Sequence, residues 1–172
     1  MLRRVFLFPA TGQDTPSGSE LLRCAVPTTF CTLIVIAALS GLSVLICTFY
    51  PSLKPNFDYV SRYPLAVSLL CFALLPAICE ELVFRRLILR FLQRRFSDFA
   101  AVLLSSLLFA VFHFGILQSV IAFIFGIFLA AVAIRTRSVI LCIYAHLLNN
   151  ALFLCIAYKC HPPSTGIMLP VT

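Results

Sequence analysis

The chain has 172 residues, of which 62% are hydrophobic and only 11% are charged, and its mean hydropathy is +1.06. A water-soluble domain is nearer half apolar and a quarter charged, so this composition excludes an ordinary soluble protein and predicts an all-α bundle of transmembrane helices. The net charge of +7 does not indicate a nucleic-acid partner, because five of the thirteen basic residues lie on one segment between two apolar runs. The eight cysteines include no Cys-x-x-Cys pair, which argues against a zinc knuckle or a redox motif.

Polar stretches divide the chain into three parts. Residues 1–22 are a polar lead that we expect to be flexible and cytosolic, residues 23–160 hold the apolar runs of the bundle, and residues 161–172 are a polar tail. Within the bundle, the expected helices in chain order are 24–50, 64–96, 99–114, 119–134 and 138–158.

Local signals set the boundaries of these helices. Pro64 is suited to a first helical turn and Ser97 to an N-cap, whereas Gly115 and Gln118 indicate a break before the fourth helix. The 36 residues from 99 to 134 are few for two full spans. We therefore expect about five spans, with the third and fourth helices short or tilted.

Basic residues are distributed unevenly about the expected spans. With the N-terminus in the cytosol, ten basic residues lie on the cytosolic side and three on the opposite side. Half of the ten are Arg85, Arg86, Arg90, Arg94 and Arg95. This imbalance favours a cytosolic N-terminus in a multi-pass integral membrane protein.

A small set of polar side chains lies within apolar helices, where ionisable groups are costly and are functional-site candidates by default. The set consists of Glu80, Glu81, Arg85, His113, His146, Asn149 and Asn150. Glu80 and His113 are equally far from the turn expected at residues 96–97, so an antiparallel helix pair brings them to the same depth. His146 and Asn150 are four residues apart and share one helix face. Three helices can therefore place these groups together, in the cytosolic half of the membrane.

Three motifs occur in order on separate apolar helices: Glu80-Glu81-x-x-x-Arg85, Phe109-x-x-x-His113 and His146-x-x-x-Asn150. Together they resemble the signature of the CPBP family, also called ABI, which contains type II CAAX prenyl endopeptidases and the bacterial intramembrane proteases similar to them. The resemblance covers about residues 64–155. It implies an intramembrane endopeptidase of the bacterial plasma (inner) membrane, acting in the lipid bilayer on a peptide or protein substrate that can itself be membrane-bound. Nothing in the sequence specifies a prenyl-binding pocket.

Peptide hydrolysis needs an activated water and hydrogen-bond donors for the developing oxyanion. Glu80, paired with His113, can take a proton from water and return it to the leaving amine. His146 and Asn150, on one helix face, can donate to the oxyanion. The resemblance implies the same assignment, with the first glutamate as the base.

The remaining members of the polar set are expected to support the site. Glu81 points about 100° away from Glu80 on a helix and pairs with Arg85 at i+4 in the favourable order. Asn149 is expected to form a helix–helix hydrogen bond, and Phe109 to pack the wall of the site.

Two alternatives remain open. His113, His146 and Glu80 can form a His₂–carboxylate zinc site with an open position for water. We favour the reading without a cofactor, because Asn150 is a poor zinc ligand but a good oxyanion donor. The second alternative is a non-catalytic membrane immunity or partner protein, in which the same cluster serves helix packing or ligand binding.

Overall fold

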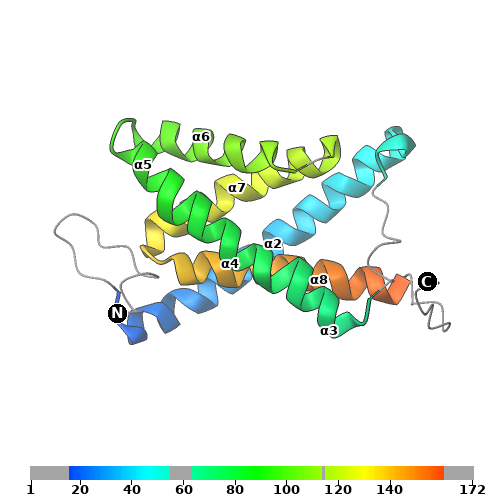
Figure 1. Ribbon diagram of the computed structural model, residues 1–172, viewed down its shortest axis with the longest axis horizontal. Coiled ribbons are helices and arrows are strands. Elements are labelled where there is room, and N and C mark those ends of the chain that lie inside the picture. Colours follow the sequence, from blue (N-terminus) through cyan, green and yellow to red (C-terminus); the bar gives the residue numbers. More distant parts are fainter. Residues whose placement is uncertain (1–15, 55–62, 114, 161–172) are drawn as a thin grey trace, which may run out of the picture.

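The structure is a computed structural model that describes residues 16–54, 63–113 and 115–160. The regular elements of these residues are all helical (Figure 1). In chain order they are α2 (Gly18–Phe49), η1 (Pro51–Leu53), α3 (Leu65–Ser68), η3 (Leu69–Leu74), α4 (Leu75–Glu81), η4 (Leu82–Ile88), α5 (Leu89–Gln93), α6 (Asp98–Val111), α7 (Ile116–Thr136) and α8 (Val139–Cys160). The expected tail, residues 161–172, and most of the expected lead lie outside the described residues.

Four helices of the described residues are long and apolar enough to cross a membrane, namely Gly18–Phe49, Leu65–Gln93, Ile116–Thr136 and Val139–Cys160. The fifth apolar helix, α6, has 14 residues and is about 21 Å long, which is short of the ~30 Å hydrocarbon core of a bilayer. The prediction of an all-α transmembrane bundle is confirmed. The expected five spans resolve into four long helices and one short one.

The observed helix boundaries differ from the expected ones by three or more residues at the starts of α2 and α7 and at the ends of the Leu65–Gln93 run and α6. α2 begins at Gly18, so residues 18–22 are helical and do not belong to a flexible lead. Ser17 and Glu20 explain the early start, because each side chain binds the other residue's backbone N–H in a capping box. α7 begins directly after Gly115, so Gln118 lies inside the helix and does not mark a break. The expected N-cap of α6 is present, since the Ser97 side chain accepts from the N–H of Ala100.

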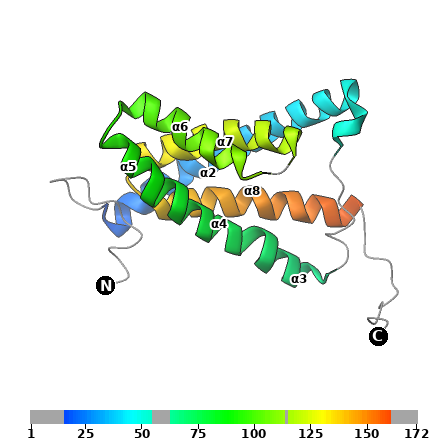
Figure 2. The ribbon, with the colours of Figure 1, turned by 45° about the horizontal axis from the view of Figure 1, so that its top comes forward.

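The helices run alternately along the long axis of the molecule (Figures 1 and 2). α6 and α7 form an antiparallel hairpin, α8 lies beneath it, and α2 packs against α7 and α8. Gly126 permits the close approach of α7 to α6, since a Cβ atom there would lie 3.2 Å from the Cβ of Ser106 and 3.3 Å from the Phe109 ring. Small residues allow membrane helices to pack backbone to backbone in this way.

The run from Leu65 to Gln93 is one helix with two wider π-helical stretches, η3 and η4. These stretches flank α4, which carries both glutamates of the first motif near its end. π-helical turns occur frequently at functional sites, because they change which side chains face a neighbour. The run packs against α8 through α4 and η4, and η4 also contacts α6 and α7, so the first motif lies between the α6–α7 hairpin and α8 (Figure 2).

Candidate active site

A cleft of about 440 Å³ lies among the Leu65–Gln93 run, the α6–α7 connection and α8. Its polar lining consists of Glu80, His113, Gln118, His146 and Asn150. Aromatic and aliphatic side chains form the rest of its wall. The structure therefore brings together all four side chains that the sequence singles out for catalysis, from three separate parts of the chain.

Four residues of the Leu65–Gln93 run line the cleft at a constant spacing of four: Phe72, Pro76, Glu80 and Phe84. In a regular α-helix, each step of four residues advances the side chain by about 40° around the axis, so such a stripe would drift off one face. The π-helical stretches have more residues per turn and rotate the stripe back. The mixed helix thus keeps Glu80 on the same face as its apolar neighbours.

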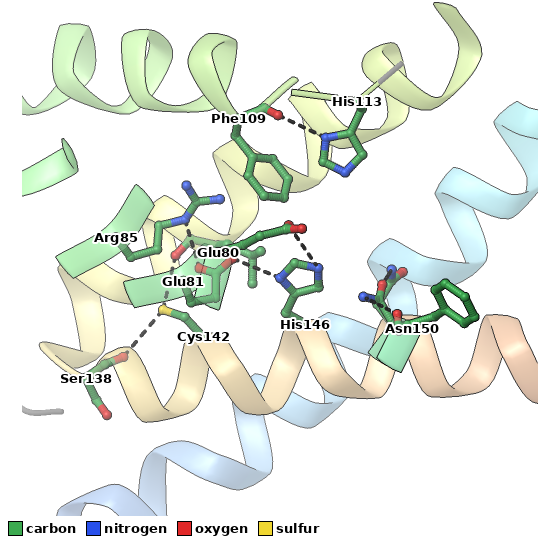
Figure 3. Close-up of polar contacts among 12 residues, drawn as sticks. Glu80, Glu81, Arg85, Phe109, His113, Ser138, Cys142, His146 and Asn150 are labelled. Atoms are coloured by element: carbon green, nitrogen blue, oxygen red, sulfur yellow. Dashed lines mark hydrogen bonds and ion pairs between the residues drawn. The ribbon is translucent and has the colours of Figure 1, made fainter. Parts of the chain in front are cut away.

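His146 lies between the two adjacent glutamates (Figure 3). Its Nδ1 is 2.9 Å from Glu81 Oε1, and its Nε2 is 3.9 Å from Glu80 Oε2. The glutamates differ in environment, because the Glu80 side chain is 33% exposed and lines the cleft, whereas the Glu81 side chain is fully buried. Glu81 therefore reaches the cleft only through the imidazole that it holds.

Behind His146, Glu81 and Arg85 form a fully buried ion pair, with 3.2 Å between Glu81 Oε2 and Arg85 Nε. The guanidinium lies over the ring of Phe109, with its central carbon 4.9 Å from the ring centroid. The Phe109 ring also contacts the imidazole of His146 edge-on at 5.8 Å. One carboxylate thus serves both the arginine and the histidine, as Figure 3 shows, and Phe109 covers this layer.

His113 follows the end of α6 and is held by its own helix. Its Nδ1 lies 2.9 Å from the carbonyl oxygen of Phe109, and its backbone carbonyl accepts a hydrogen bond from Ser119 Oγ at 2.6 Å. The other ring nitrogen points toward the cleft in Figure 3. The sequence suggests a Glu80–His113 pair, but the imidazole that the structure places in ion-pair range of Glu80 is that of His146.

Asn150 lies one turn after His146 on α8, and both ends of its amide have partners. Its Oδ1 accepts from Asn149 Nδ2 at 3.0 Å, and its Nδ2 lies 3.5 Å from the carbonyl oxygen of Phe72. The hydrogen bond that Asn149 makes here is within α8, whereas the sequence suggests a helix–helix hydrogen bond for this residue.

The zinc alternative requires three convergent protein ligands. Among residues 16–54, 63–113 and 115–160, no group of three or more His, Cys, Asp or Glu side chains is arranged to hold a metal ion. The Nδ1 atoms of His113 and His146 are engaged by a carbonyl and by Glu81, so Nε2 is the ring nitrogen left for the cleft in both. Because the described side chains do not converge as a three-ligand set, we derive no step through a metal.

Seven residues of the cleft received no site role from sequence reasoning, and Pro76 and Gln118 are the two that are not phenylalanine or leucine. A signal for Pro76 was available, because it stands four residues before Glu80 inside an apolar helix, where proline is unusual. Gln118 is an isolated amide in an apolar stretch. Because it was assigned to a helix break, it was not considered as a residue of the site.

Comparison with known proteins agrees with these motifs. The sequence model of the family described as type II CAAX prenyl endopeptidase Rce1-like matches residues 62–152, which is more than half of the chain and includes all three motifs. Comparison with curated proteins and with solved structures gave no match. With four long apolar helices, the protein is an integral membrane protein, and the chain belongs to the type II CAAX prenyl endopeptidase Rce1-like family.

Proposed function

We propose that this protein is an intramembrane endopeptidase in which Glu80 activates the water that hydrolyses a peptide bond. The observation that carries the proposal is the convergence of Glu80, His113, His146 and Asn150 on one cleft. The Glu80 side chain is 33% exposed and lines the cleft, so its carboxylate can accept a hydrogen bond from a water molecule there. A base with this exposure and a histidine beside it matches the requirements of general acid–base catalysis.

In the proposed reaction, Glu80 takes a proton from water while the water oxygen bonds to the substrate carbonyl carbon. His113 orients this water through the ring nitrogen that faces the cleft. The tetrahedral intermediate then collapses, the C–N bond breaks, and Glu80 returns the proton to the leaving amine. The products are a carboxylic acid and an amine, which exchange a proton to become a carboxylate and an ammonium group, so atoms and charge balance without a further reactant.

The oxyanion of this intermediate needs donors that are already in place. Asn150 supplies an amide N–H. His146 is the second candidate donor, because it lines the same cleft with Nδ1 2.9 Å from Glu81 Oε1 and Nε2 3.9 Å from Glu80 Oε2.

The surroundings of the cleft suggest the substrate and the membrane side. Its phenylalanines offer an apolar wall, which suits an apolar or lipid-bearing peptide. The family name points to a prenylated Cys-a-a-X terminus as the first substrate to test. One end of the bundle gathers the exposed arginines Arg23, Arg94, Arg95, Arg135 and Arg137. By the positive-inside rule that end faces the cytosol, as we propose for the inner membrane of a bacterium.

The test uses purified protein in detergent and quenched fluorogenic peptides with a farnesylated or an unmodified Cys-a-a-X terminus. Glu80→Gln keeps the size of the side chain but removes the base, so we expect cleavage to fall by at least about 100-fold. Asp98→Asn makes the same chemical change at an exposed helix start and should leave the rate unchanged. Equal rates for wild type and Glu80→Gln would reject the proposed base.

Metal dependence is tested on the same preparation. Metal analysis should find no stoichiometric metal, and a chelator should leave cleavage of the active peptide unchanged. Stoichiometric zinc, together with loss of activity in chelator and recovery on adding zinc, would replace the glutamate mechanism with a metal mechanism.

A further inference from the structure

The segment 112–115 connects α6 to α7 and carries His113, which lines the cleft. Carbonyl groups at and beyond the C-terminus of a helix find no N–H donor within that helix. The carbonyl of His113 is bound by α7 instead, because Ser119 Oγ donates to it at 2.6 Å. One hydroxyl thus ties the end of α6 to the start of α7 at the residue that enters the cleft.

Ser119 is itself fixed by the first turn of α7. Its N–H donates to the carbonyl of the N-cap residue, Gly115, at 2.7 Å. A serine hydroxyl inside a helix commonly donates to the carbonyl four residues earlier, which here is also that of Gly115. The Ser119 hydroxyl instead reaches the carbonyl six residues earlier, which lies outside the helix. Its hydrogen bond therefore holds the connection between the helices, next to the residue Gln118 that lines the cleft.

The ring of His113 depends on the position of its backbone. Its Nδ1 lies 2.9 Å from the carbonyl oxygen of Phe109, and its backbone N–H donates to the carbonyl of Ala110 at 3.0 Å. A carbonyl oxygen only accepts, so Nδ1 carries the proton, and Nε2 of the neutral ring is an acceptor. Nε2 is the ring nitrogen that points toward the cleft in Figure 3. A displacement of the connection would therefore change where this acceptor points.

We propose that Ser119 is a positioning residue that holds His113 through its backbone carbonyl, with the acceptor Nε2 directed into the cleft. This inference rests on the proposed function, in which His113 orients the attacking water. The ring must be placed before the reaction, because a misplacement of about 1 Å can lower a rate on the order of 100-fold. Ser119 does not line the cleft, so it acts on the reaction only through His113.

Two substitutions at Ser119 separate the hydroxyl from the rest of the side chain. Ser119→Ala removes the donor, and Ser119→Thr keeps it. On the fluorogenic Cys-a-a-X peptides described above, we expect Ser119→Ala to lower kcat about 10-fold with KM within about 2-fold of wild type. Ser119→Thr should restore most of this loss. Ser43→Ala is the matched control and should leave the rate unchanged, because Ser43 Oγ also donates to a carbonyl, that of Leu39 in α2, and does not line the cleft.

A second measurement observes His113 without catalysis. The chain has three histidines, so nitrogen NMR spectra of the histidine-labelled full-length protein in detergent contain three rings, and His113→Gln identifies that of His113. Wild type should show this ring protonated at Nδ1, with a lone pair on Nε2. Ser119→Ala should move its signals toward the average of the two tautomers, because the hydrogen bond to Phe109 loosens. Ser119→Thr and Ser43→Ala should leave them in place.

Either of two results would overturn the inference. Unchanged His113 ring signals in Ser119→Ala would show that the hydroxyl does not hold the ring. A Ser119→Thr variant as slow as Ser119→Ala would show that the hydroxyl is not the cause of the loss.

The variant His113→Ala distinguishes failure of this inference from failure of the proposed function. If His113→Ala lowers kcat but Ser119→Ala does not, the positioning role is wrong and the proposed function stands. If His113→Ala cleaves as fast as wild type, the role of His113 in orienting water is wrong, and the positioning role fails with it.

Discussion

The adjacent glutamates belong to two layers of the molecule. The cleft layer contains Glu80, whose side chain is 33% exposed, and the buried layer behind it contains Glu81 and Arg85, which are 0% exposed. A group that exchanges protons with water needs access to the cleft, whereas a buried charge needs its partner to offset desolvation. We therefore expect substitutions in the cleft layer to lower the rate and those in the buried layer to lower the stability.

The largest effect on stability is expected from breaking the buried layer. Arg85→Met removes the partner of Glu81 and leaves a buried carboxylate without its compensating charge. The free energy of unfolding should fall by about 3–5 kcal/mol, measured by thermal or denaturant unfolding in detergent. Arg94→Met, at an exposed arginine of the same segment, should change it by less than about 0.5 kcal/mol.

A double variant sharpens this prediction. Glu81→Leu combined with Arg85→Met removes both charges, and buried ion pairs can often be replaced by apolar side chains at little cost. The double variant should therefore be more stable than Arg85→Met alone. A double variant as unstable as the single one would show that the charges do not compensate each other.

An intermediate effect is expected where α7 supports the buried layer. Gly126→Val would push against Ser106 and Phe109, and Phe109 covers Arg85. Such overpacking costs about 1–3 kcal/mol of unfolding free energy. Gly41→Val is the matched control, because a Cβ at Gly41 meets nothing within 4 Å. Equal stability of the two variants would show that the α6–α7 contact at Gly126 does not support the buried layer.

The smallest effect is expected outside both layers, where α2 meets α8. Thr29 Oγ1 lies 3.0 Å from the hydroxyl of Tyr144, and Thr29→Val removes this hydrogen bond. Helix–helix hydrogen bonds in membrane proteins contribute about 0.6 kcal/mol, so a loss of that size is expected in unfolding experiments. Thr48→Val in the same helix removes only a hydrogen bond to Val44. Cleavage rates should be unchanged in both variants, and a lower rate in Thr29→Val would extend the site to α2.

The sequence predicted the membrane bundle, the N-cap at Ser97 and the meeting of the motif residues, because hydropathy, capping chemistry and motif spacing are local or periodic signals. The start of α2 was missed because the polar residues after Ser17 resemble a flexible lead, although Ser17 and Glu20 form a capping box. The assignment of Gln118 to a break was wrong because Gly115 alone caps α7.

Side-chain pairings in the site were less predictable. Counting residues from the turn placed Glu80 level with His113. The count assumed 3.6 residues per turn throughout, whereas the two π-helical stretches have more residues per turn and change the direction in which side chains point. The imidazole in ion-pair range of Glu80 is that of His146. The i+4 contact of Glu81 with Arg85 was predictable because it depends on one helix alone. The contact of Asn150 with Phe72 joins two helices, and no local pattern encodes it.

The most direct test of the two layers is to measure cleavage and unfolding on the same preparations of Glu80→Gln and Glu81→Gln. We expect Glu80→Gln to unfold at the wild-type temperature and to lose at least about 100-fold in kcat. Glu81→Gln should unfold at a clearly lower temperature, because Arg85 loses its charge partner, and its folded fraction should retain kcat within about 10-fold. Wild-type cleavage by Glu80→Gln, or the complete loss of cleavage by a fully stable Glu81→Gln, would contradict the assignment of Glu80 to catalysis and of Glu81 to stability.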